Sequence, residues 1–124
     1  MIKINGIEFE FDAFDADDVE KAKKEMNKVV AALENPPKNL DRVGAIKYTV
    51  KNVGDCFNNL FGADSAKKIF KGKTNMKLAL KAFEDLTVGI QAQDREFEKE
   101  MEETTQKYSP NRAARRNNKN KNKK

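Results

Sequence analysis

Residues 40–61, LDRVGAIKYTVKNVGDCFNNLF, are the stretch that decides the fold. Apolar residues recur in it at steps of three or four, which places them along one face of a helix: Leu40, Val43, Ile46, Val50, Val53, Phe57 and Leu60. The opposite face carries Lys47, Lys51 and Asp55. We therefore predict a helix over about 39–61 whose apolar seam forms the core of a small bundle. An exposed seam that binds a partner is the alternative.

Two glycines interrupt this predicted helix. Gly44 and Gly54 each cost a helix about 1 kcal/mol relative to alanine. Close approach of a neighbouring helix would explain both of them, and a break in the helix near Gly54 is the alternative. The single cysteine, Cys56, lies beside the seam, and we interpret it as a buried thiol rather than a reactive one.

A β-hairpin is predicted at residues 1–11. Its turn is Asn5-Gly6, a pair that suits a two-residue turn in which both residues have positive φ. With that turn the opposed residues are Ile4 and Ile7, Lys3 and Glu8, and Ile2 and Phe9. The apolar pairs share one side of the hairpin. Because a lone hairpin is only marginally stable in water, that side must pack on the helices.

Three further helices are predicted, at about 16–34, 65–70 and 75–107. Asp15 can cap the first of them, and Asn35-Pro36-Pro37 ends it because proline donates no amide hydrogen bond. The last helix has a regular apolar stripe as far as Ile90. Beyond Ile90 its apolar positions thin to Phe97 and Met101, which stand among many charged residues.

The expected fold class is mainly α (α+β), with an N-terminal β-hairpin packed on a small three-helix bundle in one domain over 1–107. Residues 108–124 are expected to form a flexible, disordered basic tail. The charge distribution supports this division, because residues 107–124 hold eight basic residues and no acidic one. Since the whole chain carries +5, residues 1–106 carry −3.

No catalytic, cofactor-binding or metal-binding site is predicted, and we expect that the protein is not an enzyme. The chain has no histidine, which removes the usual general base near neutral pH and the commonest metal ligand. The cluster of Asp12, Asp15, Asp17 and Asp18 lacks the glycine and distal glutamate of a calcium loop, and helix capping explains it better. No apolar run reaches the roughly 18 residues of a membrane span. We therefore expect a soluble cytoplasmic protein without a membrane partner.

Partner binding is predicted on the outer half of the last helix and on the tail. The hypothetical contact residues are Phe97, Met101, Tyr108, Arg112, Arg115, Arg116, Lys119 and Lys121. The apolar ones favour docking of a helical partner or self-association. The basic ones would bind any polyanion weakly, without sequence specificity and in a salt-dependent way. Contact with an acidic protein surface, or solubility alone, explains the basic residues equally well.

The chain resembles the tail assembly chaperones of tailed phages and prophages of Gram-positive bacteria. The resemblance begins with the MIKINGIEFEF hairpin at 1–11, followed by Phe14 and the acidic helix start at 15–20. It continues with NNLFG at 58–62 and Ile69-Phe70, and then with the charged helix up to Lys107. It ends with YSPNRAARR at 108–116 and so covers nearly the whole chain.

The resemblance implies a non-enzymatic chaperone that acts in the host bacterial cytoplasm. Such proteins are mostly helical, keep the tape-measure protein soluble, and help the tail-tube protein to polymerise around it. Two other classes stay open at this point. One is a small phage nucleic-acid-associated protein that acts through its basic tail, and the other is an inhibitor of host defence that occupies a protein surface.

Overall fold

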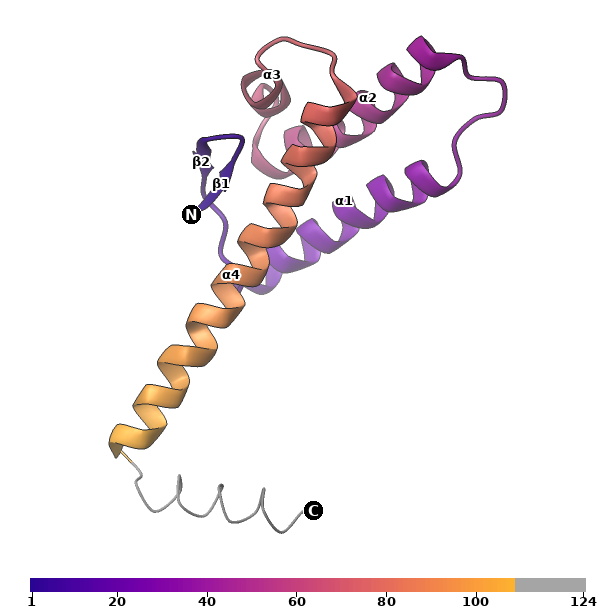
Figure 1. Cartoon of the computed structure of the whole chain (residues 1–124). Coiled ribbons are helices and arrows are strands. Elements are labelled where there is room, and N and C mark those ends of the chain that lie inside the picture. Colours follow the sequence, from indigo (N-terminus) through magenta and orange to yellow (C-terminus); the bar gives the residue numbers. More distant parts are fainter. Residues whose placement is uncertain (109–124) are drawn as a thin grey trace. The chain divides into compact units, whose positions relative to one another are not determined.

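The computed structural model describes the backbone of residues 1–108 and the side chains of residues 1–105 (Figure 1). Its elements are β1 (Ile2–Ile4), β2 (Ile7–Phe9), α1 (Ala16–Glu34), α2 (Arg42–Phe61), α3 (Ser65–Phe70) and α4 (Met76–Tyr108). The predicted fold class is confirmed, since the protein is mainly helical with an N-terminal hairpin. The chain divides into two compact units, residues 1–90 and residues 91–124. The predicted domain 1–107 spans the first unit and part of the second, and the predicted tail beyond Tyr108 lies outside the described residues.

The hairpin has the predicted register, with Ile2 opposite Phe9, Lys3 opposite Glu8 and Ile4 opposite Ile7. Its two turn residues adopt the left-handed conformation that the Asn-Gly pair favours, with φ of 49° at Asn5 and 82° at Gly6. Ile2 and Ile4 are fully buried. The apolar side of the ribbon therefore belongs to the core of the first unit, as the marginal stability of a lone hairpin requires.

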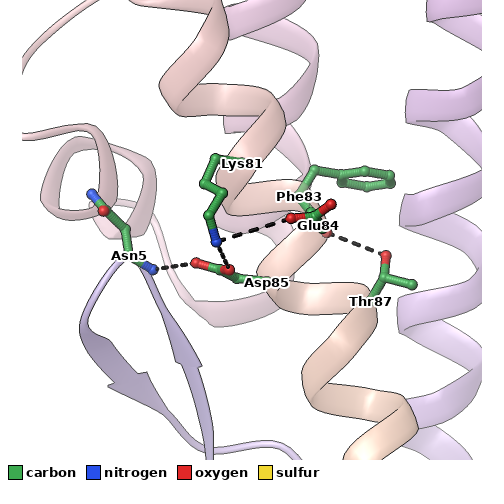
Figure 2. Close-up of polar contacts among 6 residues, drawn as sticks. All are labelled: Asn5, Lys81, Phe83, Glu84, Asp85 and Thr87. Carbon is green, nitrogen blue, oxygen red and sulfur yellow. Dashed lines mark hydrogen bonds and ion pairs between the residues drawn. The ribbon is translucent and has the colours of Figure 1, made fainter.

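The hairpin turn is tied to α3 and α4 by hydrogen bonds from Asn5. Figure 2 shows its backbone N–H donating to Oδ2 of Asp85 over 2.9 Å, while Lys81 donates to the other carboxylate oxygen over 2.7 Å. The side-chain amide of Asn5 donates to the carbonyl of Ile69 over 2.6 Å. Close by, a Cβ atom on Gly89 would stand only 2.6 Å from Cγ2 of Ile2. Glycine at that position lets β1 approach α4.

The first helix begins and ends at the predicted residues, whereas α2 begins at Arg42, three residues later than predicted. The Asp15 side chain accepts a hydrogen bond from the backbone N–H of Asp18 at the start of α1, and Asn35 is the C-cap residue of that helix. At the start of α2, Asp41 accepts from the N–H of Gly44 over 2.7 Å. The two helices are linked by the hydroxyl of Tyr48, which donates to the carbonyl of Ala32 over 2.8 Å.

The middle of the predicted seam is the core of the first unit. Val50, Val53 and Phe57 are buried, and Ile46 and Leu60 pack against the same cluster. Phe57 meets Phe70 of α3 edge to face, with ring centroids 6.1 Å apart. A Cβ atom on Gly54 would lie 3.3 Å from Cβ of Ala66 and 3.4 Å from the ring of Phe70. The prediction that Gly54 admits a neighbouring helix is thus confirmed, and α2 runs unbroken through it.

The prediction that the start of the seam is buried in the core is wrong. Leu40 precedes α2 and is 38% exposed, and Val43 in its first turn is 57% exposed, so neither residue belongs to the core. The physical reason is that helical periodicity places residues on a face but does not supply the element that covers it. The prediction for Gly44 is also wrong. A Cβ atom there would meet Asp41 and Leu40, at 3.0 and 3.2 Å, so the close neighbour is the adjacent capping segment and not another helix.

Candidate partner-binding surfaces

The buried polar groups of the first unit have structural roles. The carboxylate of Glu25 in α1 accepts hydrogen bonds from the Asn59 amide over 2.9 Å and from Lys28 over 3.1 Å. Burial by itself would raise the pKa of Glu25, but these two hydrogen bonds and the charges of Lys28 and Lys24 together hold the pKa below its ordinary value. The pKa of Asp85 is lowered in the same way, because the bonds from Lys81 and Asn5 and the charge of Lys81 together outweigh burial. Both carboxylates are ionised at neutral pH and join separate segments of the fold.

Cys56 is the buried thiol that was predicted, with only 1% of its surface exposed. Burial raises its pKa to about 12, and the nearby charge of Glu25 acts in the same direction. The thiolate form, which is the nucleophile and metal ligand, is therefore rare at neutral pH. Among residues 1–108, no group of three or more Cys, Asp or Glu residues is placed to hold a metal ion. None of the described helices is at once long and apolar enough to cross a membrane.

The first candidate surface is an open hollow of about 400 Å³ between the starts of α2 and α4. Its lining residues come from these two helices and from the segment before α4: Arg42, Ile46, Thr74, Asn75, Met76, Lys77 and Leu80. The Asn75 side chain is engaged in capping, because Oδ1 accepts from the N–H of Leu78 over 3.0 Å. Ile46, Met76 and Leu80 give the hollow an apolar floor, and Leu80 is 42% exposed. We call this surface the basic hollow.

The charged residues that line the basic hollow are both basic, Arg42 and Lys77. Residues 71–81, KGKTNMKLALK, contain four lysines and no acidic residue, and the last of these lysines, Lys81, is paired with acidic residues of the next helical turn. Residues 38–47 add Lys38, Arg42 and Lys47 against Asp41 alone, whose carboxylate already accepts from Gly44. Within the described part of the chain, neither Arg42 nor Lys77 takes part in an ion pair. Two cations without an ion pair to a described acidic residue thus line the hollow together with partly exposed apolar side chains.

Sequence reasoning missed the basic hollow because Ile46 was assigned to the core seam alone, whereas the structure also places it in the lining of the hollow. One signal was available in the sequence, namely the run of lysines without acidic residues at 71–81 that leads into a predicted helix. That run says where positive charge gathers. It does not say that apolar residues from another helix stand next to it.

The second candidate surface lies in the second unit, on α4 from Gln91 onward. Phe97 and Met101 are one helical turn apart and are 42% and 47% exposed. Residues 91–106 hold six acidic and two basic residues, a net charge of −4. Helical spacing puts Asp94, Glu98 and Glu100 three residues from one or the other apolar residue, so carboxylates flank the pair. We call this surface the acidic face.

The structure bears on only two of the predicted partner-binding residues. It places Phe97 and Met101 together on the acidic face, as their spacing implies. Tyr108 is the last residue of α4, and its side chain is not among those described. The basic residues predicted to bind a partner lie outside the described residues: Arg112, Arg115, Arg116, Lys119 and Lys121. Their roles stay predictions.

The chain belongs to a family of unknown function, DUF6673, which matches residues 5–119. The matched range contains both the basic hollow and the acidic face. No curated protein and no solved structure matches the chain. The family description assigns no activity.

Proposed function

We propose that this family member is a non-enzymatic tail assembly chaperone of a tailed phage or prophage. In this role it binds the tape-measure protein in the cytoplasm of the bacterial host and aids polymerisation of the tail-tube protein. The single observation that supports the proposal most directly is the acidic face, where Phe97 and Met101 present apolar surface to water one helical turn apart. A tape-measure protein is a long helical chain with apolar stripes, which is the kind of partner that such a pair can cover.

The energetic case rests on the exposed part of these two side chains. Burying a whole Phe or Met side chain contributes about 1.5–3 kcal/mol. With a little under half of each still exposed, the pair can contribute about 1–3 kcal/mol in total when a partner covers it. This is weak per contact, so one copy would bind reversibly. A reversible hold suits a chaperone that must leave its partner when assembly is complete.

Co-expression with a phage tape-measure protein tests the proposal. We expect the tape-measure protein to be soluble with the wild-type chain and to precipitate with a Phe97→Ser/Met101→Ser variant. A Val19→Ser/Val88→Ser variant is the matched control, because it removes two apolar residues of similar exposure, 40% and 50%, from other positions. It should preserve solubility. If the soluble fraction of the tape-measure protein is the same with and without the wild-type chain, the chaperone function is wrong.

A further inference from the structure

We propose that the protein self-associates through a contact between unlike surfaces, in which the acidic face of one copy docks into the basic hollow of a second copy. The occupant of the hollow is therefore the 91–106 helical segment of another molecule, with Phe97 and Met101 as its apolar anchors. This inference goes beyond the proposed function and does not rest on it. It concerns the purified chain alone, whereas the chaperone activity is measured with a different protein.

Charge complementarity is the first argument. The basic hollow has Arg42 and Lys77 in its lining, and neither side chain is paired with a described acidic residue. The acidic segment carries −4 over sixteen residues. Its two basic residues, Arg95 and Lys99, each stand two positions from Phe97, so on a helix they do not share its face. The helix face that carries Phe97 and Met101 is therefore negatively charged.

Apolar complementarity is the second argument. Helix-in-groove recognition uses anchors spaced by one turn, and Phe97 and Met101 have that spacing. The hollow offers Ile46, Met76 and Leu80 as an apolar floor, with a volume of about 400 Å³ that can admit large side chains. The hollow thus combines apolar and basic lining residues, as the acidic face combines apolar and acidic ones.

The geometry of the contact has a consequence for the assembly. Because two different surfaces meet, each copy still has one unused hollow and one unused acidic face after the first contact. Association then either closes as a ring of two or more copies or continues as an open chain. Both products contain the proposed contact, and the variants below act on it in the same way.

Sedimentation equilibrium of the full-length chain over a range of concentrations tests the proposal. We expect the average mass to rise with concentration in about 0.05 M salt, and to rise much less in about 0.5 M salt, where charges are screened. An Arg42→Glu/Lys77→Glu variant should associate roughly tenfold or more weakly, since two exposed attractions become repulsions. Both substitutions fall in the first turn of a helix, where glutamate is favourable, so the variant should fold.

The matched control is Lys21→Glu/Lys23→Glu on the exposed surface of α1. It changes the net charge by the same amount but lies outside the hollow. This control should associate like the wild type. The basic residues from Lys107 onward are identical in all variants, so a contact between the tail and the acidic face would survive the Arg42→Glu/Lys77→Glu change.

Mixing two variants gives the sharpest test. Glu98→Lys/Glu100→Lys alone should also associate weakly, because its altered face meets the native basic hollow. When it is mixed with Arg42→Glu/Lys77→Glu, both cross contacts pair opposite charges, and association should return to within a few-fold of the wild type. The proposal is wrong if the wild-type chain remains monomeric at low salt. It is also wrong if the hollow variant associates normally, if the Lys21→Glu/Lys23→Glu control is equally impaired, or if the mixture shows no recovery.

Discussion

The same substitution at two positions of α2 should have very different effects on the free energy of unfolding. Val50 is 9% exposed within the core cluster, whereas Val43 is 57% exposed in the first turn. Val50→Asp loses about 1.5–3 kcal/mol of apolar burial. It also places a carboxylate without a partner among buried side chains, which costs several kcal/mol more. A total of about 4 kcal/mol or more is comparable with the whole stability of a small domain, about 5–15 kcal/mol, so Val50→Asp should unfold the protein.

Val43→Asp should change the free energy of unfolding by no more than about 0.5 kcal/mol, because the position is mostly solvated. A negative charge in the first turn of a helix even contributes about 0.3–1 kcal/mol in the favourable direction. Lys47→Asp, at an exposed interior position of the same helix, is the control for the lower helix propensity of aspartate. Its effect is to be subtracted from that of Val50→Asp.

Urea unfolding followed by circular dichroism measures these differences. A loss of about 4 kcal/mol moves the midpoint by more than about 1 M urea, or abolishes the transition altogether. If Val43→Asp and Val50→Asp lower the midpoint equally, the start of the seam is covered after all. If Val50→Asp leaves the midpoint unchanged, the buried seam itself is wrong.

Three further outcomes follow from the packing and from the pKa directions. Gly89→Ala should destabilise the wild type despite the better helix propensity of alanine, because the new Cβ would stand 2.6 Å from Cγ2 of Ile2. In an Ile2→Ala background, where Cγ2 is absent, the same substitution should stabilise the protein. The folded-state pKa of Glu25 is lowered, so its contribution to stability is full above the ordinary value of 4.5 and is lost as pH falls through the folded-state pKa. Acid should therefore destabilise the wild type more than Glu25→Gln, as urea midpoints at about pH 6 and about pH 3 would show. Cys56, buried with a pKa of about 12, should react with a disulfide reagent only after unfolding, and rapid labelling of the native chain would contradict the packing around α2.

Local chemistry was enough to predict much of the fold. The φ preferences of Asn5-Gly6 set the hairpin register, and Asp15 and Asn35 set the ends of α1, because each of these signals acts over a few residues. The contact between Asn5 and Asp85 was beyond such reasoning, since 80 residues separate the two along the chain. A hydrogen bond between an amide and a carboxylate leaves no periodic trace in the sequence.

The candidate site was only partly predictable for a related reason. The exposure of Phe97 and Met101 could be predicted because the regular apolar stripe of α4 ends before them and charged residues surround them. Leu40 and Val43 continue a strong stripe, so their exposure could not be inferred from α2 alone. Exposure depends on which other elements reach a position. That is a property of the tertiary structure and not of the amphipathic pattern.

Exposed apolar residues are by themselves weak evidence of function, because isolated ones are normal on folded proteins. Val19 and Val30 on α1 are 40% and 45% exposed and need no explanation of this kind. The two candidate surfaces differ from them because each combines partly exposed apolar side chains with charge mostly of one sign, positive in the lining of the hollow and negative around Phe97 and Met101. Like charges gathered on a fold repel one another and contribute nothing to its stability. Stability alone therefore does not account for this combination, whereas recognition of an oppositely charged apolar surface does.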